Sequence, residues 1–172
     1  MFIGTEIRLD VGFSVAQARM ARLARSGVLR RASDDAYRDL AAGLARVGPL
    51  EGVPGLSRLV AVRISDMTIH ENFASVAIRW EATGPGGALF PALDADITLS
   101  PAGDDATKLT VAGVYRPPLG VLGAGLDRVV LHRVAEATIR VFARDIAAAM
   151  TDPALSPGVR PEPCPGTEHG TP

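Results

Sequence analysis

The chain has 172 residues, of which 47% are hydrophobic and 22% are charged, and its formal net charge is −1. This length fits one domain with a tail, and the apolar content is sufficient for a packed core. The near-neutral charge gives no reason to expect nucleic acid as a partner. The single cysteine, Cys164, excludes an intramolecular disulfide bond.

The sequence shows no segment that would direct the chain into a membrane. Its first residues lack the basic region followed by an apolar run that marks a signal peptide. No apolar run approaches the roughly 20 residues of a membrane-spanning helix. We therefore expect a cytoplasmic protein without stable membrane insertion.

The N-terminal third predicts one strand followed by two short helices. Residues 2–11 alternate between apolar and polar side chains, as a half-buried strand requires. Ser14 and Gln17 form a capping-box pattern, which predicts a helix over residues 15–26. A second helix is expected from about residue 33 to about residue 46, before a Gly-Pro break.

The middle of the chain predicts four strands, and a long helix follows them. The strand segments are residues 58–69, 73–83, 92–99 and 107–116, separated by short polar or Gly/Pro-rich connections. Their alternation favours an antiparallel sheet with one covered face and one solvated face. A helix over residues 121–150 is long enough, at roughly 45 Å, to cross and cover this sheet. This order indicates an α+β architecture.

A helical wheel of the last helix predicts which of its faces is buried. The apolar stripe on this wheel consists of Leu126, Val130, Val134, Ala137, Val141 and Ala148. Asp127 and Asp145 lie toward the same side, where a carboxylate is costly unless it is paired. The helix dipole accounts for Asp127 near the helix start, whereas Asp145 needs an arginine from the first two helices.

The C-terminal end differs in composition from the rest of the chain. Residues 151–172 contain six of the 13 prolines and few large apolar side chains. Such a segment cannot bury enough apolar surface to become ordered. We therefore predict one domain over residues 1–150 and a disordered Pro-rich tail over residues 151–172.

The approach to the last helix carries a recognisable pattern. It reads Gly-x-Tyr-x-Pro-Pro-x-Gly, at Gly113, Tyr115, Pro117, Pro118 and Gly120. This pattern and the element order resemble small bacterial members of the START-like (SRPBCC, polyketide cyclase/dehydrase-like) superfamily. The resemblance implies a helix-grip fold, in which a curved antiparallel sheet wraps around the long C-terminal helix and leaves an apolar cavity between them.

Members of this superfamily have six or seven strands, whereas the alternation identifies five here. A split of the segment 58–69, or a short strand near residues 88–91, would supply the remainder. The superfamily includes carriers of hydrophobic ligands as well as aromatases, cyclases and hydrolases, so the fold leaves the function open.

The predicted cavity walls are mostly aliphatic, with two large amphipathic side chains, Trp80 and Tyr115. These two either anchor a polar group of a ligand or pack as ordinary core residues. Arg116 is expected to grip an anionic group at the cavity mouth or to be a solvated rim residue. The other candidate ligand-binding residues are Ile78, Ile97, Val111, Val130 and Val134.

Three functions remain open, of which binding of a small hydrophobic ligand (lipid, polyketide or isoprenoid-like) is favoured. The second is an aromatase/cyclase-type enzyme that uses Tyr115 and Asp127, although no catalytic motif is present. The third is an interaction module with a filled interior. The scattered histidines, His70, His132 and His169, predict no metal site. We expect no cofactor, and a monomer or a weak homodimer.

Overall fold

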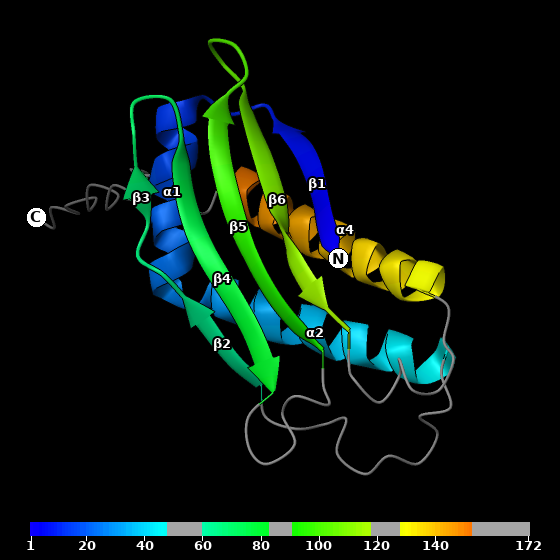
Figure 1. Ribbon diagram of the computed structural model, residues 1–172. Helices are drawn as coiled ribbons and strands as arrows, with labels where there is room; N and C mark the ends of the chain where they lie inside the picture. The colour runs from blue at the N-terminus through cyan, green and yellow to red at the C-terminus, as the bar shows by residue number, and fades with distance from the viewer. Residues whose placement is uncertain (48–59, 83–90, 118–127, 153–172) are drawn as a thin grey trace, which may run out of the picture.

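The computed structural model describes residues 1–47, 60–82, 91–117 and 128–152. These residues form three helices and a six-stranded sheet (Figure 1). In chain order the elements are β1 (Phe2–Leu9), α1 (Phe13–Ser26), α2 (Val28–Val47), β2 (Val60–Ile64), β3 (Thr68–Ile69), β4 (Ala74–Ala82), β5 (Ala92–Pro101), β6 (Thr107–Arg116) and α4 (Arg128–Thr151).

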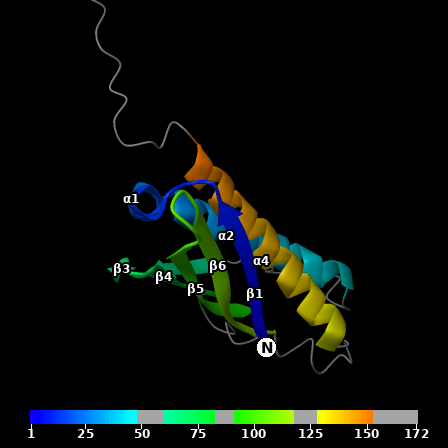
Figure 2. The ribbon, with the colours of Figure 1, turned by 90° about the horizontal axis from the view of Figure 1, so that it is seen from above.

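The strands form one curved antiparallel sheet in the order β1-β6-β5-β4-β2, with β3 also paired to β4. Figures 1 and 2 show the three helices gathered on one face of this sheet. The last helix, α4, packs against β1, β6 and α2. This is the α+β helix-grip architecture that the sequence predicts, and the topology confirms it.

Alternation along the strands decides which side chains meet the helices. On β5, Leu93, Ile97 and Leu99 are buried on the inner face, which is the face that the helices cover. Asp94 and Asp96 point to the outer, solvated face. The two-face alternation predicted for this strand is therefore confirmed.

The first two helices differ from the prediction at their starts. Helix α1 begins at Phe13 after an N-terminal cap at Gly12 that makes no side-chain hydrogen bond, so the predicted capping box at Ser14 is wrong. Ser14 already lies inside the helix. Gly27 ends α1 in the left-handed conformation, with φ of 75°, which glycine adopts without a Cβ clash. Helix α2 starts directly afterwards at Val28, earlier than predicted, and its second residue, Leu29, is buried in the core.

The long predicted strand over residues 58–69 is split in two. Strands β2 and β3 both pair with β4, and the three residues from Ser65 to Met67 separate them. The hydroxyl of Ser65 accepts a hydrogen bond of 2.9 Å from the backbone N–H of Ala77 at this break. The split supplies the sixth strand, while most of the segment 88–91 lies outside the described residues.

Helix α4 buries a different face from the one that the helical wheel predicts. Ala137, Val141 and Ala148 are exposed, and Asp145 is exposed beside them, so the predicted stripe and the buried carboxylate are both wrong. The large side chains that α4 contributes to the core are Leu131, Ile139, Phe142, Ile146 and Met150.

Side-chain size explains the rotation of α4. The exposed stripe consists of valine and alanine, whereas the buried face carries leucine, isoleucine and phenylalanine, which remove more apolar area from water. Val130 and Val134 lie at the boundary and are half-buried. Val134 faces α2 so closely that a Cβ at Gly43 would lie 2.9 Å from its Cγ1 atom.

Two predictions about the chain ends remain outside this description. The first residues of the predicted last helix, before Arg128, are not described. The predicted tail begins at Thr151, which is the final residue of α4, and lies outside the described residues from 153 onward. Within the described ranges, no helix combines the length and apolar character needed to cross a bilayer.

Candidate functional site

A row of four buried side chains crosses the inner face of the sheet. Backbone register aligns Val62 of β2 with Trp80 of β4, Trp80 with Leu93 of β5, and Leu93 with Tyr115 of β6. All four are almost completely buried. The row therefore brings the two amphipathic residues that the sequence singles out onto one line, with Leu93 between them.

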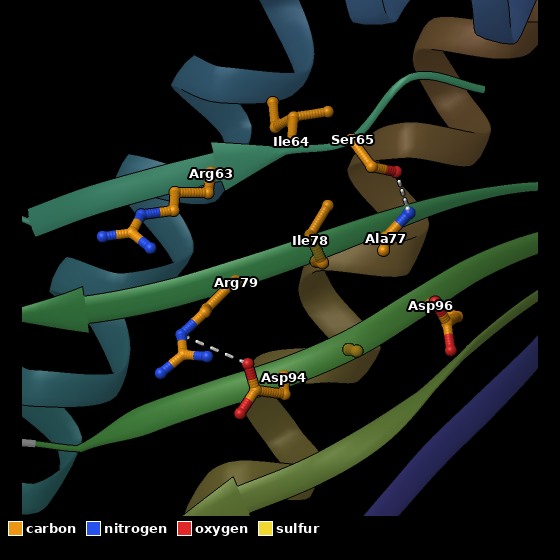
Figure 3. Close-up of a pocket in the computed structure, with 9 residues that line it drawn as sticks. Arg63, Ile64, Ser65, Ala77, Ile78, Arg79, Asp94 and Asp96 are labelled. Atoms are coloured by element: carbon orange, nitrogen blue, oxygen red, sulfur yellow. Dashed lines mark hydrogen bonds and ion pairs between the residues drawn. The ribbon is translucent and has the colours of Figure 1, made fainter.

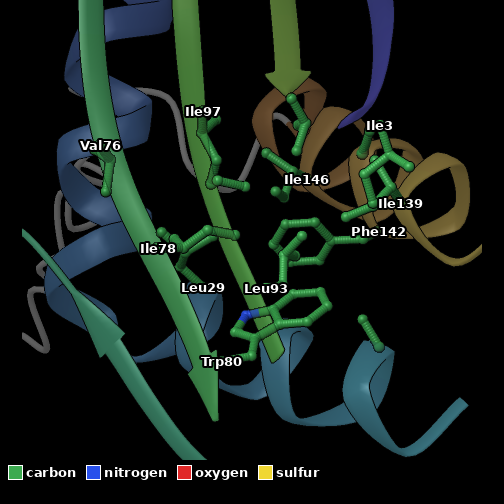
Figure 4. Packing of buried hydrophobic residues seen from close by; sticks show 14 of the residues in the cluster. Ile3, Leu29, Val76, Ile78, Trp80, Leu93, Ile97, Ile139, Phe142 and Ile146 are labelled. Atoms are coloured by element: carbon green, nitrogen blue, oxygen red, sulfur yellow. The ribbon is translucent and has the colours of Figure 1, made fainter. Parts of the chain in front are cut away.

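Trp80 anchors one side of this row against the last helix. Its indole ring meets the ring of Phe142 edge-on, with centroids 5.1 Å apart and planes at 82° (Figure 4). This edge-to-face geometry is favoured because the positive ring edge meets the negative ring face. The contact fixes α4 against β4 and holds the indole in place.

Two hydrogen-bond donors in this row have no partner among the described residues. These donors are the buried indole Nε1 atom of Trp80 and the buried hydroxyl of Tyr115, and the hydroxyl of Ser33 on α2 likewise has no partner within the described ranges. A buried polar group left unpaired costs about 1–3 kcal/mol. Such groups are uncommon in native proteins, and each needs an explanation.

Tyr37 of α2 is a third amphipathic residue of the site, and the sequence analysis does not identify it. It is buried, and its hydroxyl donates a hydrogen bond of 3.4 Å to the carbonyl oxygen of Pro91. Tyr37 lies one turn after Ser33, so both project from the same face of α2. The apolar spacing of Leu29, Ala36 and Leu40 on that face is the signal that would have indicated its burial.

Burial keeps both phenols protonated. It raises the pKa of Tyr37 to about 12. The pKa of Tyr115 is raised further, first by burial and then by the neighbouring Tyr37 hydroxyl. Both groups are therefore neutral hydrogen-bond donors at physiological pH, and neither is a base.

We expect these pKa shifts to appear in an alkaline titration. Tyr37 and Tyr115 are the only tyrosines of the chain. Because the folded pKa lies above the ordinary value of 10, the unfolded chain loses its protons first as the pH rises. The contribution of the two protonated phenols to the free energy of unfolding is complete below pH 10. It is lost as the pH rises from 10 toward 12 and beyond. Ultraviolet absorbance should detect tyrosinate only together with unfolding. Ionisation of either tyrosine near pH 10 in the folded chain would contradict the burial described above.

The structure separates the predicted aliphatic site residues into two groups. Ile78, Ile97 and Val111 are buried on the inner face of the sheet, on the same side as Trp80 and Tyr115. Val130 and Val134 are half-buried at the edge of α4. Thr138, which also faces the interior, already donates its hydroxyl hydrogen to the carbonyl of Val134 at 3.0 Å.

Of the two polar candidates Arg116 and Asp127, only Arg116 lies within the described residues. Arg116 is exposed on the outer face of the sheet, where its guanidinium lies 3.2 Å from the carboxylate of Asp94. It is therefore not at the mouth of the interior, because it points to the opposite face from Tyr115. Asp127 lies outside the described residues. Within the described residues, Arg116 therefore forms no catalytic pair with Tyr115.

The outer face carries a shallow groove of about 440 Å³ between β2, β4 and β5 (Figure 3). Charged side chains beside it form a continuous ladder, in which Glu81 pairs with Arg63 at 2.9 Å and with Arg79 at 3.1 Å. Arg79 also pairs with Asp94 at 3.4 Å. The charges of the ladder neutralise one another, so the groove offers a ligand little uncompensated charge.

The described histidines make local contacts. His70 stacks on Phe73 with ring centroids 4.3 Å apart, and His132 pairs with Glu136 at 3.2 Å. Across the described ranges, no three histidine, cysteine or acidic side chains gather closely enough to hold a metal ion. The third histidine of the chain, His169, lies outside those ranges.

The strand order and the position of α4 against the sheet define a helix-grip fold. No protein-family model matches the chain, and no curated protein sequence matches it. The predicted resemblance is confirmed at the level of the fold, and it rests on the topology described above.

Several solved structures are similar in outline. A conserved protein from Geobacillus kaustophilus has 15% identity, with 87% of this chain and 95% of that chain covered and a TM-score of 0.46. The Zhui aromatase/cyclase from a Streptomyces species has 10% identity, 87% and 90% coverage and a TM-score of 0.34. Norcoclaurine synthase from Thalictrum flavum, solved with dopamine and hydroxybenzaldehyde, has 12% identity, 84% and 87% coverage and a TM-score of 0.33. Similarities this low carry no argument about function.

Proposed function

We propose that this protein binds a small, largely apolar molecule in the interior between the sheet and α4. The observation that carries the proposal is the pair of buried donors without partners, Trp80 Nε1 and the Tyr115 hydroxyl. A bound molecule with polar atoms would satisfy both donors and remove their cost. The aliphatic residues around them would contact its apolar part.

Binding is better supported than catalysis. A general acid or base needs a pKa near the working pH, and burial moves the pKa of Tyr115 away from that range. The hydroxyl of Thr138 is engaged with its own helix backbone. An aromatase/cyclase-type reaction would therefore depend on Asp127 or on other residues that are not described.

A filled interior is the second candidate, and one observation favours it. Trp80, Phe142 and Leu93 are almost completely buried and already pack together. If this packing leaves no space for a ligand, the domain serves as an interaction module. Its unpaired donors then lower the free energy of unfolding.

Native mass spectrometry of the purified chain, with organic extraction of the same sample, separates these candidates. A carrier should show a stoichiometric small adduct, and a Tyr115→Phe variant should retain less of it than the matched outer-face variant Val114→Ala. Trp80 is the only tryptophan, so its fluorescence should also respond to an uncharged apolar probe such as prodan. A clean apo mass together with an unchanged tryptophan emission would eliminate the binding proposal in favour of a filled interior.

A further inference from the structure

We infer that the molecule bound in the interior presents uncharged carbonyl oxygens, one to Trp80 and one to Tyr115, and that carboxylic acids and amines are excluded from this site. The inference rests on the proposed function, because it describes the chemistry of the ligand for the same interior. It follows from the direction of the unpaired hydrogen bonds, from the charge of the surroundings and from the position of Leu93.

The direction of the hydrogen bonds requires an acceptor. An indole N–H donates and has no lone pair to accept, so only an acceptor atom can pair with Trp80. The Tyr115 hydroxyl keeps its proton, because burial raises its pKa, and it is therefore also a donor. An ammonium group would leave the Trp80 donor unpaired and would gain no anionic partner from either residue.

The charge of the surroundings requires a neutral acceptor. Among the described residues, the buried polar side chains are Ser33, Thr107 and Thr138, and none of the buried side chains is ionisable to a cation. Arg79 of the ion-pair ladder and Arg116 lie on the opposite face of the sheet and are already paired. On the helix side, the exposed Arg30 of α2 donates its guanidinium hydrogen to the backbone carbonyl oxygen of Val62 at 2.8 Å, so this cation is engaged at the edge of the row. A buried carboxylate without a cation loses its hydration without compensation, which costs several kcal/mol.

The register places the apolar side chain of Leu93 between the two donors. Trp80 and Tyr115 are on strands separated by β5, so their backbones lie roughly 10 Å apart. Leu93 stands between them in the same row and faces the interior. A ligand that lies across Leu93 contacts it with an apolar carbon skeleton and directs an oxygen atom toward a donor at either side.

A matched series of naphthalene compounds tests the inference by isothermal titration calorimetry. The series consists of methyl naphthyl ketone, the isosteric hydrocarbon isopropenylnaphthalene, naphthoic acid and naphthylethylamine. We expect the ketone to bind about tenfold more tightly than the hydrocarbon, which is the effect of one hydrogen bond to either donor. The acid and the amine should bind more weakly than the hydrocarbon.

Variants connect this preference to a particular donor. Tyr115→Phe removes one hydroxyl and keeps the ring, so it should lower the affinity for the ketone severalfold and leave the affinity for the hydrocarbon unchanged. Val114→Ala, on the same strand but on the outer face, should change neither affinity. Circular dichroism and thermal unfolding of each variant should confirm that it is folded before the titrations are compared.

The outcomes distinguish the two proposals. Equal affinities for ketone and hydrocarbon, or tighter binding of the acid or amine, would overturn the carbonyl inference while ligand binding itself stands. The same holds if Tyr115→Phe weakens ketone and hydrocarbon alike. If none of the four compounds binds and no adduct is purified with the protein, the proposed function fails and the inference fails with it.

Discussion

Substitution of Gly113 by alanine is expected to lower the free energy of unfolding by about 3 kcal/mol, near the upper end for an overpacked position. A Cβ atom at this position would lie 2.5 Å from the Cβ of Ala95 and would also collide with the backbone oxygen of Asp94. These obstacles belong largely to the backbone of β5, which is hydrogen-bonded to β4 and β6 on its two sides. The strand cannot move away without disturbing both neighbours.

Gly4→Ala provides the matched control for Gly113→Ala. It is also a glycine-to-alanine change in the same sheet, but its Cβ would lie 3.3 Å from the Cβ of Ala112 on the exposed face. We expect a loss below about 1 kcal/mol, because surface positions tolerate small shifts. Urea denaturation followed by circular dichroism gives both values. Equal midpoints for the two variants would show that β5 does not approach β6 as closely as described.

Phe142→Ala is expected to cost about 4 kcal/mol, as large-to-small substitutions of buried phenylalanine do. The change removes a fully buried ring and with it the edge-to-face contact with Trp80. Because Trp80 is the only tryptophan, its emission should shift to longer wavelength as water enters the space. Chemical denaturation and fluorescence of the same sample measure both effects.

Val141→Ala, the neighbouring position on α4, separates the two possible faces of this helix. Val141 is 44% exposed, so its truncation should change stability by less than about 1 kcal/mol. If Val141→Ala were the more damaging of the two variants, α4 would bury the valine and alanine stripe that the helical wheel selects. The comparison therefore tests the orientation of the helix as well as the contact at Phe142.

The sheet was predictable because strand periodicity is strict. A shift of one residue moves every side chain of a strand to the other face, so Leu93, Ala95 and Ile97 must share the covered face. The last helix gave no such constraint. It carries apolar residues around most of its circumference, and the buried face was decided by the larger side chains Phe142 and Ile146.

The positions of some polar residues of the site could also be predicted from the sequence, whereas those of others could not. Trp80 and Tyr115 were predictable, because both fall on the apolar side of an alternating strand. Arg116 follows Tyr115 directly, and the same alternation places it on the outer face, which should have excluded it from the cavity mouth. The apolar spacing on α2 indicates the covered face that holds Tyr37 and Ser33, but which strands and helices these two residues meet depends on how α2 packs against β2 and α4.

The pairing of β1 with β6 also determines when this domain can form during synthesis. Their register joins Phe2 to Val114 and Leu9 to Thr107, and α4 then packs on β1. The first strand therefore has no partner in the sheet until residues 107–114 have left the ribosome. Contacts between residues so distant in sequence close slowly, because the intervening loop loses conformational entropy before any contact compensates for it. A ribosome-bound nascent chain that ends before β6 must keep Ile3 and Leu9 exposed, where a chaperone can hold them.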